Sequence, residues 1–482
     1  MVATEPFKVI VVGGGPVGLT AAHALHAAGI DFVLLERRSS MVEKSGASLV
    51  LDPTTMRVMS QLGLTGRLEP LAVQVGRAQS LTKDGYMFKD TNNTTIIAKW
   101  CGAKNGPKLF LSKLTWRKTS SLGAAPYIFH RAELTKSLYD GLPKVAKDRI
   151  HPGKKVVDIT TGDDSVSVTC DDGSSFHGSI VIGADGVYSK TRRLMMKASG
   201  ESDENPFVAK YRCLWCSFPR PESSPPGLAC DTQGQDHSAM YLAGVDKAWI
   251  FLYELLPQPT KERASYTGQD IDDMVARFAD DHLTDKIQVK DVFNRDTAGM
   301  SNLDEGIAPR WSSGRIVLAG DACHKFAPNA GAGFNTGIQD VVALCNRLRD
   351  LLHQKDDGGD NDNDNNNNIN SGGVSPSVDE LGRIFDEYRT ARKEGVKSEY
   401  GRSVLVSRTQ AWANTLYWVV ARYVLSISLL ESLVIRFLAV REIRKGLVLE
   451  YVRGEEPFHG PVSFVNPIKP WEPDTDKMSQ GC

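Results

Sequence analysis

The sequence lacks an excess of charge of either sign, because 57 Lys and Arg residues balance 58 Asp and Glu residues. A chain without a basic excess has no broad surface for nucleic acid, so we expect no nucleic-acid partner. Residues 1–7 also lack the pattern of a signal peptide. We therefore expect an intracellular protein whose cysteines are reduced.

The sequence is also poor in patterns that bind metals. Its eight cysteines are scattered, and the single C-x-x-C pair, Cys213 and Cys216, has no second pair and no nearby histidine. Zinc and dithiol sites need such companions. The favoured interpretation is two cysteines on a β-strand, and we expect no metal site.

What the sequence does contain, close to its start, is a glycine motif between a strand and a helix. Residues 9–12 are apolar and β-branched, which predicts a buried parallel strand. Gly13, Gly15 and Gly18 then match G-x-G-x-x-G. In this motif the first glycine allows a tight turn, the second lets a pyrophosphate approach the backbone, and the third lets helix and strand pack closely. The motif predicts a dinucleotide site.

The elements after these glycines agree with that prediction. A helix is expected from about residue 16 to residue 28, and its N-terminal N–H groups would face the phosphates. The next apolar run, 32–35, predicts a second strand. Glu36 ends this strand, where its carboxylate can accept hydrogen bonds from an adenosine ribose.

Two further motifs follow predicted strands later in the chain. Residues 183–192 read GADGVYSKTR, and residues 320–335 read GDACHKFAPNAGAGFN. The three motifs, in this order, resemble those of single-component flavin monooxygenases of the para-hydroxybenzoate hydroxylase type. The third motif is most similar to that of the fungal epoxidases of indole-diterpene and meroterpenoid pathways. The resemblance covers residues 9–352 and implies FAD as the cofactor.

The resemblance implies a role in FAD binding for residues in and between the three motifs. Asp321 would accept a hydrogen bond from the ribityl chain, and the helix that opens at Gly331 and Gly333 would favour negative charge on the flavin. Asp185 belongs to a motif tied to both nucleotides, and Arg131 matches an arginine that touches FAD. The residues expected to bind FAD are Gly13, Gly15, Gly18, Glu36, Gly46, Val50, Arg131, Asp185, Asp321, Gly331, Gly333 and Phe334.

The sequence departs from the family pattern at two positions. Cys323 replaces a small alanine or valine, and Phe334 replaces a small residue beside the flavin face. His324 is expected to form a local hydrogen bond rather than to act in catalysis or to bind a metal. The chain has one G-x-G-x-x-G only, so the resemblance implies that NAD(P)H visits the flavin transiently instead of occupying a fold of its own.

The chemistry implied by the resemblance is oxygen transfer from a flavin C4a-hydroperoxide. An electron-rich alkene can attack the distal oxygen without a general base, whereas phenol hydroxylation needs a base for the phenol. The sequence holds no His–Asp or Tyr–Tyr relay that requires the second reaction. We predict an FAD-dependent monooxygenase that uses NAD(P)H and O2 to epoxidise an alkene in a large apolar secondary metabolite, such as a terpenoid, a prenylated indole or a polyketide polyene.

Two alternatives to this function stay open. One is an aromatic hydroxylase or dearomatising monooxygenase. The other is a non-catalytic protein of the flavoprotein fold that binds a prenyl chain. Asp321 and Arg131 argue against the second alternative, because a protein without redox chemistry has no need of these cofactor contacts.

The candidate catalytic residues lie on a predicted strand and in the second motif. Tyr211 and Arg212 begin the strand, and either can orient substrate above the flavin. Because side chains alternate along a strand, at most one of the two points toward the flavin. An ordinary strand tyrosine and a surface arginine are an equal alternative. Arg192 is the third candidate, with a structural pairing to Asp185 as its alternative.

A length of 482 residues exceeds a single core, so we predict two domains. The fold class is α/β (α+β): a Rossmann-like FAD-binding domain interleaved with a β-sheet substrate domain, and followed by C-terminal helices. The predicted divisions are 1–70, 127–200 and 301–352 for the FAD-binding domain, 71–126 and 201–300 for the substrate domain, 355–377 for a disordered low-complexity loop, and 378–482 for the C-terminal helical region and tail.

Residues 411–440 are strongly apolar and interrupted by three charged residues. Their longest uncharged run is too short for a clean membrane span. The favoured interpretation is a pair of buried helices that cover the flavin-binding domain. The alternative is a set of helices on an intracellular membrane surface, with Trp412, Trp418 and Tyr423 at the interface.

Overall fold

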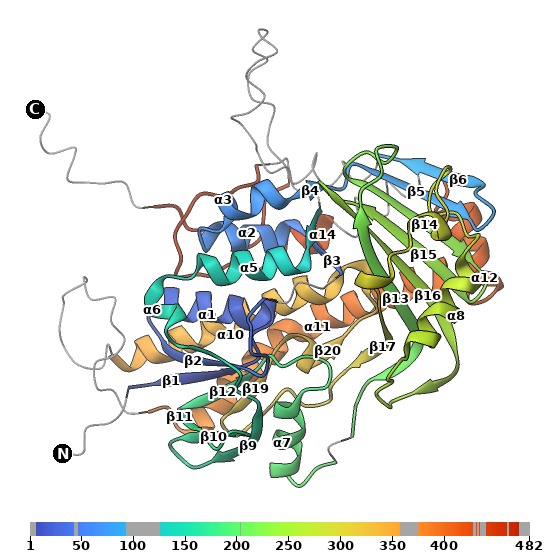
Figure 1. Cartoon of the computed structure of the whole chain (residues 1–482). Helices are drawn as coiled ribbons and strands as arrows, with labels where there is room; N and C mark the ends of the chain where they lie inside the picture. Colours follow the sequence, from blue (N-terminus) through green and yellow to red (C-terminus); the bar gives the residue numbers. More distant parts are fainter. Residues whose placement is uncertain are drawn as a thin grey trace, which may run out of the picture.

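A computed structural model of the chain has a mixed α/β fold, which confirms the predicted fold class (Figure 1). It contains two large sheets, of six and eight strands, and two small three-stranded sheets. The structure describes residues 6–42, 47–92, 126–202, 204–356, 375–427, 430, 433, 440–459 and 462–471. Most of the predicted low-complexity loop, and Gly46, therefore lie outside the described residues.

The six-stranded sheet is built around β1, whose residues Val9 to Val12 are between 0% and 5% exposed. Such burial on both faces is what a short β-branched strand in a parallel sheet requires. β1 pairs in parallel with β2 on one side and β12 on the other. In spatial order the strands are β18 (Ser312–Ser313), β19 (Ile316–Leu318), β12 (Ile180–Gly183), β1 (Lys8–Val12), β2 (Asp31–Glu36) and β8 (Ile150–Pro152).

Helices cover one face of this sheet, and a β-meander lies on the other side (Figure 1). The helices of this part are α1 (Pro16–Ala27), α2 (Pro53–Gln61), α3 (Thr65–Leu68), α5 (Arg131–Gly141), α6 (Lys144–Lys147), α7 (Lys190–Ala198) and α10 (Ala332–Asp356). The meander is β9 (Val156–Thr161), β10 (Val166–Cys170) and β11 (Ser175–Gly178), and the remaining small sheet is β3 (Ser48–Leu51), β7 (Tyr127–His130) and β4 (Val73–Gln74).

The eight-stranded sheet has two different apolar faces because its side chains alternate. In spatial order its strands are β20 (His324–Lys325), β17 (Gly299–Ile307), β13 (Val208–Pro219), β16 (Lys247–Thr260), β15 (His237–Ala243), β14 (Leu228–Gly234), β5 (Arg77–Thr82) and β6 (Met87–Thr91). One face packs against α8 (Gly268–Phe278) and α9 (Val289–Val292). The other face carries Tyr211, Trp249, Phe251 and Tyr253 and packs against Ile128 of β7.

The course of β17 bears on the predicted domain division. β17 lies within the eight-stranded sheet and runs to Ile307, so the predicted boundary at residue 301 cuts through one strand. We propose to place this boundary at residue 308 and to keep the other divisions as predicted.

The long helix α11 (Val378–Gln410) packs along α10 and leads to the apolar segment, where α12 (Thr415–Val419) and a π-helical turn (Val420–Val424) follow. Leu416 is 69% exposed and Tyr423 is 60% exposed. Arg422 lies over the rings of Tyr86 and Phe88, which belong to the β5–β6 hairpin. A buried helix pair over the flavin-binding domain was therefore the wrong prediction for the described part of this segment. Nowhere in the described chain does a helix combine the length and apolarity that a bilayer span demands.

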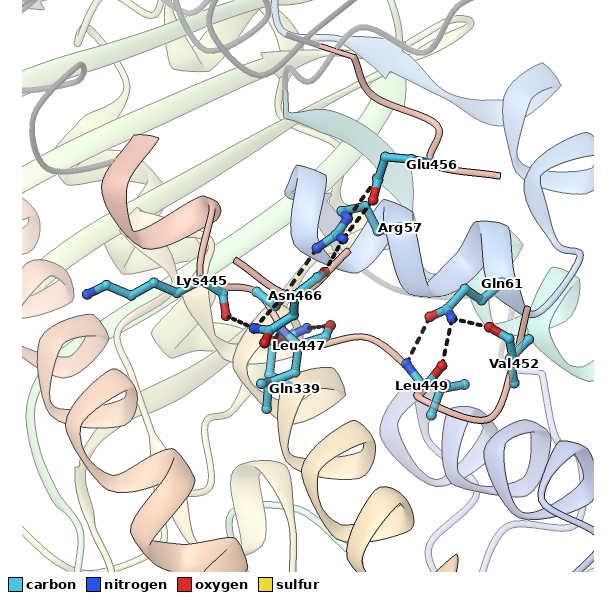
Figure 2. A network of polar contacts seen from close by, with 10 residues as sticks. Arg57, Gln61, Gln339, Lys445, Leu447, Leu449, Val452, Glu456 and Asn466 are labelled. Carbon is cyan, nitrogen blue, oxygen red and sulfur yellow. Dashed lines mark hydrogen bonds and ion pairs between the residues drawn. The ribbon is translucent and has the colours of Figure 1, made fainter. Parts of the chain in front are cut away.

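Residues 440–459 and 462–471, here called the C-terminal strap, include α14 (Val440–Ile443). Figure 2 shows their polar contacts with α2 and α10. Arg57 of α2 is fully buried and donates to both carboxylate oxygens of Glu456, at 2.8 and 2.7 Å. Gln61 of α2 and Gln339 of α10 bind main-chain groups of the strap. The strap thus links α2 to α10, and α10 packs against α1, the helix of the glycine motif.

Candidate active site

In the glycine motif between β1 and α1, a side chain would have free space at one glycine and would clash with the backbone at the other two. Gly13 has a φ of +110°, and a Cβ on it would lie 2.5 Å from the carbonyl oxygen of Ala184. A Cβ on Gly18 would lie 1.9 Å from the carbonyl oxygen of Gly13. A Cβ on Gly15 would meet nothing within 4 Å. The open space at Gly15 faces the N-terminus of α1, where backbone N–H groups favour a phosphate.

Glu36 lies at the end of β2, directly beside this turn. Its Oε2 accepts from the backbone N–H of Gly14 at 2.6 Å, and its Oε1 accepts from Nε of Arg38 at 2.8 Å. Burial opposes ionisation of Glu36, but the hydrogen bonds and charge of Arg38, together with Gly14, outweigh it and lower the pKa of the carboxyl. An ionised acceptor therefore stands where the sequence predicts a ribose contact.

The second motif holds the turn after β12. Asp185 accepts from Oγ of Ser189 at 2.5 Å and from a backbone N–H of α7 at 3.0 Å. Arg192 is 4% exposed and donates to the carbonyl oxygens of Ala322 at 2.7 Å and Val187 at 2.9 Å. Its guanidinium therefore ties the second motif to the third. The catalytic assignment of Arg192 stays a prediction.

The third motif meets the first through Val17 of α1. A Cβ on Gly320, whose φ is +62°, would lie 3.2 Å from Val17, and a Cβ on Gly337 would lie 2.7 Å from the same side chain. Asp321 follows Gly320, is 32% exposed at its side chain and pairs with Lys325 at 2.6 Å. The two glycine-rich segments, about 300 residues apart in sequence, are thus neighbours in the fold.

The start of α10 faces both Asp321 and β3. A Cβ on Gly333 would lie 3.6 Å from Oδ1 of Asp321, and a Cβ on Gly331 would lie 3.3 Å from Val50. Asn335, which the sequence reasoning did not single out, donates to the carbonyl oxygen of Val50 at 2.8 Å. Its position as the last residue of the third motif was the available signal. Phe334 is half-buried beside it.

Arg131 begins α5 and is exposed. Its backbone N–H donates to the carbonyl oxygen of Ala47 at 3.1 Å, which places this cation next to β3. An exposed guanidinium at this edge suits an anionic group.

A buried polar network lies beneath the third motif. Asp340 of α10 is fully buried, and its Oδ2 accepts from Gly320 N–H at 3.0 Å and lies 2.6 Å from Nε2 of His324. Its Oδ1 accepts from Nε of Arg392 at 2.8 Å. Burial would raise the pKa of Asp340, but His324 and Arg392 outweigh it and hold the pKa below its usual range. The sequence reasoning missed Asp340 and Arg392, because their partners are distant in sequence.

One property of this network bears on the prediction that there is no metal site. The ligand atoms of Cys323, His324 and Asp340 lie within 4.8 Å of one another, and all three residues are buried. Arg392 already occupies an oxygen of Asp340 with a positive charge, and a cation placed there would be repelled by it. We therefore assign hydrogen bonding to His324, as expected from the sequence.

Tyr211 and Arg212 point to opposite faces of the eight-stranded sheet, as alternation requires. Arg212 donates from Nε to Glu254 at 2.7 Å, on the face that carries α8. Tyr211 is 4% exposed on the other face, and the guanidinium carbon of Arg408 lies 4.7 Å from its ring centre. Of the pair, only Tyr211 therefore faces the third motif.

A narrow hollow lies between this face and the third motif, and in this structure it has no space for a water-sized group. Arg408 of α11 donates to both oxygens of Glu305, at 3.2 and 2.6 Å, at its edge. Sequence patterns do not predict this ion pair, because its partners are 103 residues apart. The lining residues are Tyr211, Ser238, Tyr253, Leu303, Glu305, Ala327, Asn329 and Ser407.

Residues 6–360 match the model of the FAD binding domain family. The chain is 42% identical over 236 residues to the FAD-dependent monooxygenase SAT1 of Stachybotrys chartarum, which covers 49% of this chain and 74% of that protein. It is 30% identical over 433 residues to the FAD-dependent monooxygenase esdpE of Penicillium shearii, which covers 87% and 82%. These relatives confirm the resemblance and argue against a non-catalytic prenyl-binding protein.

The fold is shared with HpxO of Klebsiella pneumoniae, solved with FAD and uric acid. The TM-score is 0.68 at 19% identity, over 91% of this chain and 96% of that one. The residues present here fit FAD, because the space at Gly15 is open while an ionised Glu36 and the Asp321 carboxylate border the two converging motifs. The chain therefore belongs to the FAD binding domain family and is an FAD-dependent monooxygenase.

Proposed function

We propose that this monooxygenase uses NAD(P)H and O2 to epoxidise an alkene in a large apolar secondary metabolite, such as a terpenoid, a prenylated indole or a polyketide polyene. The observation that carries the proposal is the aromatic face of the eight-stranded sheet. Trp249, Phe251 and Tyr253 are at most 5% exposed on it, and its hollow is bordered by Ala327 and Asn329 of the third motif. An apolar wall beside the cofactor motif suits an apolar substrate.

The residues of this chain would hold FAD, and the bound cofactor would supply the reducing electrons and the activation of O2. The N-terminus of α1 at Gly15 and the guanidinium of Arg131 would bind the pyrophosphate, and Glu36 would bind the ribose. Asp321 and the N-terminus of α10 would bind the ribityl chain and the flavin. α11 and the sheet would exclude water from the reacting groups.

We assign different tasks to the three candidate catalytic residues. Tyr211 faces the hollow and would orient the substrate. Arg212 is paired with Glu254 on the far face, and Arg192 binds two carbonyl oxygens between motifs. We propose that both arginines act through the structure, and that Tyr211 alone of the three contacts substrate.

The cofactor assignment is tested by replacing Asp321. The variant Asp321→Ala should fold but lose its yellow colour, while Asp350→Ala, at an exposed carboxylate of α10, should keep it. A fully flavinylated and active Asp321→Ala would contradict the assignment.

The reaction is tested with isotopically labelled O2 and a panel of prenylated indoles and polyprenyl phenols. An epoxide that contains one labelled oxygen atom is the expected product. A labelled phenol, or a labelled dearomatised ketone, would instead establish the aromatic hydroxylase alternative.

We also propose that the apolar segment within 411–440 rests on a membrane surface. Leu416, Trp418, Tyr423 and Ile427 are between 36% and 69% exposed, and Trp and Tyr favour the interface between lipid and water. The triple variant Leu416→Glu, Trp418→Glu, Tyr423→Glu should no longer pellet with phosphatidylcholine–phosphatidylserine vesicles. Trp471→Glu, a change outside the segment, should pellet as the parent does. Equal pelleting of both variants would refute the proposal.

A further inference from the structure

The third motif places a lysine between buried neighbours. His324 and Phe326, the residues on either side of Lys325, are 0% and 2% exposed. The side chain of Lys325 itself is 27% exposed, so its ammonium has lost part of its contact with water. Removing a charged group from water costs free energy unless the group is paired. A cation at this position therefore needs a partner, and the identity of that partner indicates its task.

The backbone of Lys325 is held by a strand, which fixes the direction of the side chain. β20 pairs antiparallel with β17, and Lys325 lies opposite Gly306. Because side chains alternate along a strand, His324 and Lys325 point to opposite sides. Nε2 of His324 lies 2.6 Å from Asp340 beneath the motif. Nζ of Lys325, on the other side, donates to Oδ2 of Asp321 at 2.6 Å.

The two carboxylate oxygens of Asp321 consequently have different surroundings. Oδ2 accepts from Lys325, whereas Oδ1 accepts from no donor in the part of the chain that the structure describes. A Cβ on Gly333 would lie 3.6 Å from Oδ1, so this oxygen lies beside the start of α10. The terminal torsion of an aspartate is soft, and the bond at Oδ2 restricts it. The free acceptor therefore stays at the place where we expect the ribityl chain.

A second carboxylate lies near Lys325 but has a donor of its own. Asp304 of β17 is 3% exposed and accepts from the hydroxyl of Tyr188 at 3.0 Å. Burial raises the pKa of the Asp304 carboxyl, and the hydrogen bond from Tyr188 and the charge of Lys325 oppose this increase only in part. Among the described residues, Lys325 forms its ion pair with Asp321. The ammonium is thus committed to the acid of the third motif.

We propose that Lys325 is a positioning residue for FAD, which holds Oδ2 of Asp321 so that Oδ1 is ready to accept a hydrogen bond from the ribityl chain. This inference rests on the proposed contact between Asp321 and FAD, and it adds the residue that prepares this contact. An acceptor that is ordered before the ligand arrives lowers the ordering cost of binding. Lys325 acts through Asp321 and contacts neither the substrate nor the reacting atoms.

The first test removes the ammonium and keeps most of its apolar stem. Lys325→Met in the full chain, freed of FAD, should raise the dissociation constant of FAD by about 3- to 10-fold, as measured by equilibrium dialysis. Lys325→Arg should restore binding, because a guanidinium can donate to the same oxygen. Lys397→Met is the control, since Lys397 forms an exposed pair with Glu394 on α11. The control should bind FAD as the parent does.

A double-mutant cycle separates positioning from a direct contact or a general loosening of the fold. In the Asp321→Ala background, Lys325→Met should change the dissociation constant of FAD by less than about 2-fold, because the residue through which it acts is gone. Dialysis at high FAD concentrations makes the weaker binding of this background measurable. The urea midpoint of FAD-free Lys325→Met should stay close to that of the parent, since a half-exposed ion pair contributes little stability.

Three outcomes would overturn the proposal. They are unchanged FAD binding in Lys325→Met, an equal loss of binding in Lys325→Arg and Lys325→Met, and a loss that persists in full when Asp321 is already alanine. The proposed contact fails by a different sign, namely an Asp321→Ala variant that binds FAD as tightly as the parent. Weakened binding in Asp321→Ala without any coupling to Lys325 refutes the present inference alone.

Discussion

Removal of two carboxylates near the third motif should have two different effects. Loss of Asp340 should lower the stability of the fold, whereas loss of Asp321 should weaken FAD binding. Asp340 is fully buried and bonded to Gly320, His324 and Arg392. Asp340→Ala would leave the Arg392 charge buried without a counter-ion, a change that costs about 3–5 kcal/mol. Because domains are typically stable by only about 5–15 kcal/mol, a loss of this size is easily measured.

Asp321 is the matched comparison, because its side chain is 32% exposed and, among the residues that the structure describes, pairs with Lys325 alone. Loss of such a pair should change the stability of the FAD-free protein by less than about 1 kcal/mol. Loss of the carboxylate should nevertheless weaken FAD binding. We thus expect one acid to support the fold and the other to bind the cofactor.

Urea unfolding of the FAD-free proteins, followed by circular dichroism, measures the first effect, and flavin fluorescence titration measures the second. Asp340→Asn is a further variant that retains the size of the side chain but not its charge, and it should be intermediate in stability. The reasoning is refuted if Asp340→Ala unfolds within about 1 kcal/mol of the parent, or if Asp321→Ala binds FAD as the parent does.

The pH dependence of the Asp340 contribution has a definite sign. Its pKa in the folded protein is held below the ordinary 3.8, so the unfolded chain binds its proton first as the pH falls. The stabilisation is complete above about pH 4 and is lost progressively at lower pH. The stability difference between the parent and Asp340→Asn, measured by urea unfolding, should therefore shrink only in that acidic range.

Three further predictions concern the glycine turn, α1 and the strap. Gly15→Ala should change the stability of the FAD-free protein by less than about 1 kcal/mol and weaken FAD binding, since its Cβ meets no protein atom. Gly18→Ala should lower the stability and also weaken FAD binding, because its Cβ would overlap the carbonyl oxygen of Gly13. The same unfolding midpoint and the same FAD affinity for the two variants would contradict this. Burial lowers the pKa of His23 from 6.5 to about 4, so stability should fall by up to about 3 kcal/mol as the pH decreases between these values, and His23→Gln should remove that part of the unfolding profile. Arg57→Ala should destabilise the protein by about 3–5 kcal/mol and expose the strap to limited proteolysis; an unchanged cleavage pattern would count against an anchoring role.

The features that could be predicted from the sequence depend on short stretches of chain. The strand, glycine turn and helix around Gly13 to Gly18 follow from local apolar periodicity and from steric limits on the backbone. The opposite directions of Tyr211 and Arg212 follow from the two-residue repeat of a strand, whichever sheet contains it. The three motifs indicated the family and the cofactor for the same reason, since each motif is a contiguous run of residues.

The remaining features needed the folded chain, because their partners are far apart in sequence. No local pattern indicates that Arg392 pairs with Asp340 or that Arg408 neutralises Glu305 at the hollow. The segment after α11 is apolar enough for a core, yet it lies beside Tyr86 and Phe88 with its large side chains exposed. The hydrophobicity of a segment indicates how strongly it favours burial away from water. Whether another part of the chain covers the segment depends on how distant elements pack.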